Sequence, residues 1–159
     1  MDEALLDSPL GTCRILANAE GLVSVAFVDK RVASKEPTSF RPNRHIEQSL
    51  EELDAYFSGQ LTRFNCRTAP IGTQFQKRVW QRLIAIPFGA TKSYGQIAAE
   101  LGQPTAARAV GGANNRNPLP IIIPCHRVIG SGKTLIGYAC GLWRKQWMLE
   151  HEGIALPLG

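Results

Sequence analysis

The ten residues from Ile121 to Gly130, IIIPCHRVIG, place a thiol, an imidazole and a guanidinium next to one another. Three β-branched apolar residues and a proline precede them, which is typical of a buried strand. Three interpretations fit Cys125 and His126: a cysteine packed in the core, a pair of metal ligands, and a nucleophile beside its activating base. The remaining sequence discriminates among the three.

A catalytic thiol needs help from its surroundings. Free cysteine has a pKa of about 8.5, so a reactive thiol requires a base, a cation or a helix N-terminus nearby. In an extended segment Cys125 and His126 would point to opposite faces, so the imidazole reaches the sulfur only if the chain turns after Pro124 or through a bridging water. The acid that orients the imidazole must come from elsewhere, and Glu152 is the candidate.

The other interpretations compete on the same two residues. A lone cysteine beside a histidine is more often part of a core than catalytic. A cysteine protease would pair the same groups, yet it needs a cleft for a peptide. Adjacent Cys and His side chains have poor geometry for binding one metal ion. On these residues alone the core interpretation stays open.

The cysteine and histidine content argues against a metal or disulfide scaffold. No C-x-x-C spacing occurs among the cysteines, at positions 13, 66, 125 and 140, and only three histidines accompany them. The N-terminal MDEALL lacks the basic and apolar regions of a secretory signal, and no stretch is long enough to span a bilayer. We therefore expect a soluble, cytoplasmic protein that does not bind membranes.

The net charge of +5 is unevenly distributed. Residues 1–70 hold eight Lys and Arg against ten Asp and Glu, or −2, whereas residues 71–159 hold ten against three, or +7. The second half is therefore the one suited to a polyanion, although charge alone favours nucleic acid only weakly.

The first 66 residues predict a small α/β scaffold domain. Residues 8–29 read as a hairpin that turns at 18–21, and residues 45–59 have the apolar spacing of an amphipathic helix. The polar, Pro-containing segment 31–44 reads as a surface loop.

A Pro- and Gly-containing linker at 67–72 leads to the second predicted domain, 73–159. Capping-box patterns at Thr73 and Ser93 begin two helices, and Thr105 is a candidate cap for a third, AARAVGGANN. The last two helices have helix-turn-helix spacing. The third is built of small residues around Arg108, which indicates either close helix packing or close approach to a DNA backbone.

The final segment, GLWRKQWMLEHEG, predicts a C-terminal helix that packs on this domain. Its expected apolar stripe leaves Arg144 and Lys145 outside, and consists of Leu142, Trp143, Trp147, Met148 and Leu149.

Several motifs follow one another in order along nearly the whole chain. NPLPIII precedes PCHRV, with ARAVGGA upstream and GYACGLWRKQWMLEHEG downstream, while SPLG, AYF and GTQFQKRVWQRLIAIPFGATKSYGQIAAELG come earlier. This ordered set resembles the O6-alkylguanine-DNA alkyltransferases, the methylated-DNA–protein-cysteine methyltransferases. The resemblance favours the nucleophile interpretation and implies a ribonuclease-H-like α/β domain followed by a mainly helical, winged helix-turn-helix-like domain.

The resemblance also implies the chemistry of the site. Cys125 matches the alkyl acceptor, which attacks as an ionised sulfur and keeps the group as a thioether, so each molecule acts once. His126 matches the residue that takes the thiol proton through a water, and Glu152 the acid that orients it. Tyr94 matches the tyrosine that donates a hydrogen bond to the departing guanine and makes a close steric contact with a DNA phosphate. Asn117 matches the asparagine that ties down the turn after the recognition helix.

DNA contacts and a base pocket follow from the same resemblance. Arg108 matches the side chain that enters the stack where the damaged base leaves. The expected DNA-binding set comprises Arg108, Tyr94, Thr105, Ala106, Ala109 and Gly111. The expected pocket, in which the Val128 carbonyl and the backbone around Ala139 read the base, comprises Val128, Ala139, Cys140 and Pro120.

The implied partner is double-stranded DNA that contains O6-alkylguanine, with O4-alkylthymine as a minor substrate. We expect no cofactor. Some relatives bind a structural zinc in the first domain, but we expect none here, because His45 is the only histidine of the first half. We expect a monomer, and cooperative binding along DNA stays open. The rival hypothesis is a non-catalytic module that recognises alkylated bases, against which Cys125 argues because such relatives lack the cysteine.

One position departs from the family pattern. Two small residues, often Gly-Gly, usually precede the leucine of the last block, and the first of them is Cys140 here. A thiol at this place would narrow the pocket, act as a second nucleophile or simply pack. We favour packing in a narrower pocket.

Overall fold

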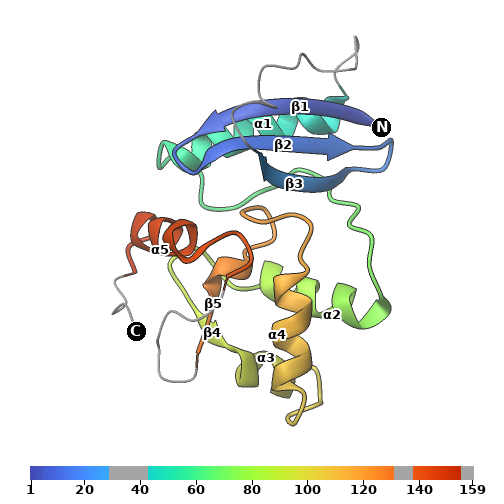
Figure 1. Cartoon of the computed structure of the whole chain (residues 1–159), viewed down its shortest axis with the longest axis vertical. Helices are drawn as coiled ribbons and strands as arrows, with labels where there is room; N and C mark the ends of the chain where they lie inside the picture. Colours follow the sequence, from blue (N-terminus) through green and yellow to red (C-terminus); the bar gives the residue numbers. More distant parts are fainter. Residues whose placement is uncertain (29–42, 131–137, 155–159) are drawn as a thin grey trace. The chain divides into compact units, whose positions relative to one another are not determined.

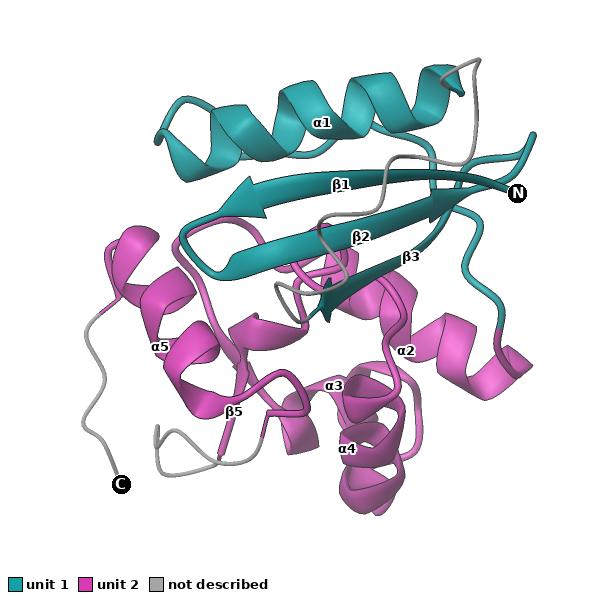
Figure 2. Cartoon of the chain, turned by 45° about the horizontal axis from the view of Figure 1, so that its top comes forward, with its two compact units in different colours: residues 1–71 teal, residues 72–159 magenta. Residues whose placement is uncertain are grey.

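A computed structural model describes residues 1–28, 43–130 and 138–154. The chain forms two compact units, Met1–Ile71 and Gly72–Gly159, coloured separately in Figure 2. None of the described helices is both long enough and apolar enough to span a membrane.

The first unit is built on an antiparallel sheet of three strands in the order β1-β2-β3. Its strands are β1 (Asp2–Ser8), β2 (Gly11–Ala17) and β3 (Leu22–Val28). The predicted hairpin is β2 and β3, and Asn18 Oδ1 accepts from the backbone of Gly21 in the turn. The strand β1 was not predicted, because DEALLDS has no alternation of polar and apolar residues.

The helix α1 (Arg44–Phe57) covers one face of this sheet (Figure 1). Its core-facing residues include Ile46, Leu53 and Tyr56, which agrees with the predicted amphipathic pattern. Asn43 caps the helix by accepting from the His45 amide at 2.7 Å. Of the predicted loop 31–44, residues 31–42 lie outside the described residues.

The segment 67–69 belongs to the first unit. The Leu22 amide donates to the Arg67 carbonyl at 2.8 Å, and the Ala69 amide donates to the Leu22 carbonyl at 2.7 Å. These bonds form a parallel bridge beside β3. The segment expected to link the domains therefore begins by pairing with the first unit, where its backbone completes the hydrogen bonding of Leu22.

The second unit begins with three helices, α2 (Gln74–Ile84), α3 (Tyr94–Glu100) and α4 (Ala107–Asn115). Both capping boxes predicted at Thr73 and Ser93 are present. The prediction that Thr105 caps α4 is wrong: Ala106 takes the N-cap position and no side chain bonds there. The helices α3 and α4 pack against each other in the predicted helix-turn-helix (Figure 1).

The segment 121–123 is buried, as predicted, but it is not a strand. Asn117 Oδ1 accepts from the Leu119 amide and Asn117 Nδ2 donates to the Ile123 carbonyl, which bends the chain over the intervening residues. A single 3-10 turn, η1 (Cys125–Arg127), follows, and only then the short strand β5 (Val128–Ile129), which pairs in parallel with β4 (Lys92–Ser93).

The last helix, α5 (Leu142–His151), departs from its predicted stripe. Leu142 and Trp143 are 44% and 54% exposed, whereas Lys145, expected outside, is fully buried. Lysine is tolerated there because its Nζ donates to the Val128 carbonyl at 2.7 Å.

Candidate active site

Cys125 begins the 3-10 turn that follows Pro124. The Arg127 amide donates to the Pro124 carbonyl at 3.0 Å, so the chain turns at the place where the sequence required it to. The turn removes the strict alternation of an extended strand for Cys125 and His126. Cys125 is only 4% exposed, and His126 is fully buried.

Glu152 joins His126 and Arg127 in one buried cluster. Its Oε2 lies 2.6 Å from His126 Nε2, and its Oε1 accepts from Arg127 Nε at 2.8 Å. Arg127 Nη2 also donates to Oε2 at 3.1 Å, and Nη1 donates to the Ile86 carbonyl at 2.8 Å. The acid that the sequence placed at the end of the last helix therefore meets the imidazole directly.

The protonation of this cluster follows from its charges. Burial raises the pKa of Glu152, but the hydrogen bonds from His126 and Arg127 and the positive charge of Arg127 outweigh it and lower the pKa to about 2. Burial lowers the pKa of His126, against the hydrogen bond and charge of Glu152. The pair is thus a carboxylate and a neutral imidazole at neutral pH. Nε2 carries the proton because it faces the carboxylate.

The other ring nitrogen, His126 Nδ1, is therefore an acceptor. It is buried and has no hydrogen-bond partner among the described residues. A buried acceptor without a donor is costly, and a neutral imidazole nitrogen is a competent base. The ring is oriented to take up a proton at Nδ1.

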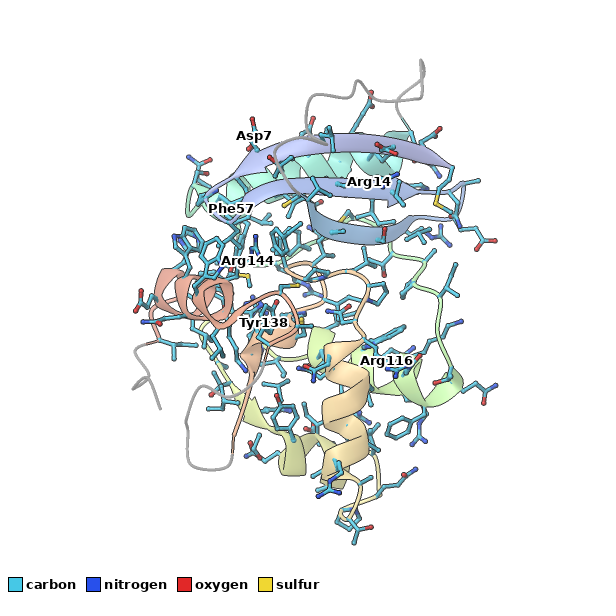
Figure 3. The ribbon with its side chains drawn as sticks, viewed as in Figure 1. Asp7, Arg14, Phe57, Arg116, Tyr138 and Arg144 are labelled. Atoms are coloured by element: carbon cyan, nitrogen blue, oxygen red, sulfur yellow. The ribbon has the colours of Figure 1, made fainter. Side chains whose placement is uncertain are left out.

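The thiol lies near three polar side chains, Tyr138, Asn117 and Lys145, of which only Asn117 was predicted from the sequence. Cys125 Sγ is 3.3 Å from the Tyr138 hydroxyl, labelled in Figure 3. Burial raises the pKa of Cys125, while the side chains of Tyr138 and Asn117 and the charge of Lys145 act to lower it. Burial prevails, so in this state the sulfur is a thiol rather than the ionised sulfur we expected.

Lys145 is the main functional candidate that sequence reasoning missed. Its Nζ lies 5.9 Å from the centre of the Tyr138 ring, in addition to its bond to Val128. Burial lowers the pKa of Lys145 to about 8, and an ionised Cys125 would act to raise it. The partners are remote in sequence, so no local pattern distinguished this lysine from a surface one.

The predicted DNA-binding residues lie on or beside α3 and α4. Arg108 and Ala109 are exposed, as is Thr105 just before the helix, whereas Ala106 and Gly111 are half-buried. Tyr94 begins α3, and a Cβ atom at Gly111 would lie 3.8 Å from its ring. Burial, and then the charge of Cys125, raise the pKa of Tyr94, so its hydroxyl keeps its proton. The exposed side of α4 thus carries small side chains and Arg108.

The predicted pocket residues differ in their exposure. Pro120 and Val128 are buried, Ala139 is exposed and Cys140 is half-buried. The Val128 carbonyl, which is expected to read a base, already accepts a hydrogen bond from Lys145. The second lone pair of this oxygen is left to accept from a base. Among the described residues no group of three or more His, Cys, Asp and Glu is placed to hold a metal ion, and the absence of zinc stays a prediction.

Comparison with known proteins identifies two matching family models. Residues 1–70 match the ribonuclease-like domain of 6-O-methylguanine DNA methyltransferase, and residues 74–154 match its DNA-binding domain. The chain is 46% identical to the methylated-DNA–protein-cysteine methyltransferase of Methanosarcina acetivorans, over 94% of this chain and 97% of the relative. It is also 46% identical to the Mycobacterium leprae protein of the same name, over 92% and 89%.

Solved structures give the same result. The Mycobacterium tuberculosis O6-methylguanine methyltransferase superimposes with a TM-score of 0.81 at 40% identity, covering 94% of this chain and 91% of that one. The Mycobacterium tuberculosis protein in complex with DNA has the same TM-score at 41% identity, over 93% and 90%. These matches confirm the predicted fold and transferase activity, and the chain belongs to the 6-O-methylguanine DNA methyltransferase family.

Proposed function

We propose that this protein repairs O6-alkylguanine in double-stranded DNA by transferring the alkyl group irreversibly to its own Cys125. The observation that carries the proposal is the buried series of Cys125 on its turn, His126 with an acceptor Nδ1, and the Glu152 carboxylate. It lies in the same unit as the helix-turn-helix. A DNA-binding module without chemistry has no need of such a series.

His126 acts as the general base in this proposal. A water between Nδ1 and Sγ carries the thiol proton to the imidazole, and the Glu152 carboxylate stabilises the imidazolium that forms. Arg127 holds the carboxylate in place through two bonds. Since burial keeps Cys125 protonated, the thiol loses its proton only as the substrate arrives. The sulfur is therefore protected from oxidation while no substrate is bound.

The transfer itself is an in-line displacement. The sulfur forms a bond to the alkyl carbon as the bond from that carbon to O6 breaks, and the electron pair of that bond passes to the guanine. Tyr94 donates a hydrogen bond to the departing base, and its raised pKa keeps its hydroxyl protonated for that role. The proton that the guanine gains balances the one that left the Cys125 thiol. A thioether cannot be hydrolysed by the groups at this site, so each molecule reacts once.

The helix α4 binds the DNA and promotes extrusion of the damaged base from the duplex. Its exposed small side chains allow close approach to a DNA backbone, and Arg108 fills the space that the extruded base leaves. Base extrusion costs a few kcal/mol, less where alkylation has weakened the pair. Asn117 sets the turn between this helix and the thiol through its two bonds.

The base then occupies a pocket that includes Pro120, Val128, Ala139 and Cys140. O4-alkylthymine is a minor substrate of the same pocket, and the protein acts as a monomer. Cys140 narrows the pocket and takes no part in the transfer.

A stoichiometry experiment tests this proposal. Protein is mixed with an excess of duplex that contains O6-methylguanine, and repaired guanine is counted over time. We expect a plateau at one guanine per protein, no repair by Cys125→Ala with DNA binding retained, and the same plateau for Cys140→Ala. Continued turnover, or repair by Cys125→Ala, would contradict the proposal.

A further inference from the structure

A tight turn lies between the thiol and the last helix. The Gly141 amide donates to the Tyr138 carbonyl at 2.9 Å, which closes the turn over Ala139 and Cys140. Its first residue, Tyr138, contacts the Cys125 sulfur through its hydroxyl. Gly141 ends it with φ +99°, a conformation that favours glycine. Any movement of this turn therefore changes the space beside the sulfur.

Arg144 holds the turn from the first turn of α5. Its Nη1 donates to the Cys140 carbonyl at 2.6 Å, and its guanidinium lies 4.5 Å from the centre of the Trp143 ring. A hydrogen bond from a charged donor to a carbonyl is stronger than one between two neutral groups. The face of the Trp143 ring restrains the same guanidinium.

Trp143 also contacts the turn itself. A Cβ atom at Gly141 would lie 3.3 Å from Cδ1 and 3.4 Å from Nε1 of Trp143, so the absence of a side chain there admits the indole. The Trp143 ring thus contacts both Gly141, at the end of the turn, and the Arg144 guanidinium, which binds the Cys140 carbonyl in the turn. The two side chains restrain the turn at neighbouring positions.

We propose that Arg144 and Trp143 form a clamp that determines which O6 substituents the site accepts, by preventing the Tyr138–Gly141 turn from yielding to large groups. The inference rests on the proposed function, because it concerns the pocket wall of that reaction. Arg144 is a positioning residue that acts through the Cys140 carbonyl. A methyl group needs no movement of the turn, whereas a benzyl group does.

The test compares methyl and benzyl transfer from otherwise identical duplexes in one sample, so that the fraction of active protein cancels. For Arg144→Ala and Trp143→Ala we expect the ratio of benzyl to methyl rate to rise about tenfold, the size of effect that one methylene of pocket space produces. Trp143→Phe keeps an aromatic ring, so its ratio of benzyl to methyl rate should stay near that of the unchanged protein. Gln146→Ala, on the same helix, is the matched control.

The outcomes separate the two proposals. Methyl transfer at the original rate with a raised ratio supports the clamp, since a merely structural loss would lower both rates together. A ratio equal to or below that of the unchanged protein in both alanine variants would overturn the clamp and leave the repair function intact. Absence of methyl transfer in the unchanged protein would overturn both.

Discussion

His126 Nε2 lies 2.6 Å from Glu152 Oε2, and both side chains are fully buried. The two residues come from different elements, the 3-10 turn and the C-terminal end of α5. Because the carboxylate fixes the proton on Nε2, it leaves Nδ1 as the base. The orientation of this one ring connects the fold of the second unit to the chemistry of the thiol.

Replacing Glu152 by Gln should slow transfer far more than it weakens DNA binding. The neutral amide no longer stabilises the imidazolium, and general-base assistance is worth about 10²- to 10⁴-fold. Single-turnover rates and binding to duplex DNA measure the two effects. Glu150→Gln, exposed on the same helix, is the control, and equal losses in both variants would show that Glu152 has no special role.

Glu152 should also make stability depend on acid pH. Its folded-state pKa is about 2, below the ordinary value of 4.5, so its contribution is fully present above pH 4.5 and is lost as the pH falls towards 2. The difference in unfolding free energy between the unchanged protein and Glu152→Gln should therefore shrink over this window in denaturant titrations. A difference that is constant with pH would contradict the ionised assignment.

Lys145→Met should make the thiol less reactive. The lysine charge lowers the pKa of Cys125, so its removal should move the pH profile of iodoacetamide alkylation to higher pH. Tyr138→Phe should shift the profile in the same direction, because its hydroxyl also lowers the pKa. Unchanged profiles in both variants would mean that neither group acts on the sulfur.

Lys145 has a second signature, in which stability again rises with pH but in an alkaline window. Its folded-state pKa of about 8 lies below the ordinary 10.5, so the buried charge costs stability below pH 8 and this cost disappears as the pH rises towards 10.5. Relative to Lys145→Met, the unchanged protein should gain stability over that window in urea titrations. A flat difference would indicate an unshifted lysine.

Arg108→Ala should impair repair in duplex DNA more than reaction with the free O6-alkylguanine base. The free base needs no extrusion. In duplex DNA, however, the variant lacks the side chain that fills the space of the extruded base, so we expect the repair rate to fall roughly tenfold to a hundredfold on duplex DNA alone. Arg82→Ala, exposed at the end of α2, controls for charge. Equal losses on both substrates would remove Arg108 from base extrusion.

Local signals in the sequence predicted much of this structure. The capping boxes at Thr73 and Ser93 are confirmed because each depends on residues three apart, and the amphipathic spacing of α1 is confirmed because one face of a helix decides it. The strand β1 lacked any such periodicity and pairs only through its neighbour β2. Its existence depends on a partner rather than on its own residues.

The site was predictable in its residue types and less so in its geometry. Cys125, His126 and Glu152 carry chemistry that is recognisable in sequence, and the family resemblance implied that Asn117 holds the turn before them. The partners of Asn117, the Leu119 amide and the Ile123 carbonyl, came only from the structure. Lys145 read as a surface residue, since only the distant Val128 carbonyl explains its burial. Long-range polar contacts of this kind leave no periodic trace.

The most direct test of the account is the mass and position of the adduct. Protein incubated with duplex DNA that contains O6-methylguanine is weighed intact and then digested for peptide mapping. We predict the gain of a single methyl group, located on Cys125 and absent from Cys140. Binding of the DNA without any gain in mass, or a methyl group on another residue, would contradict it.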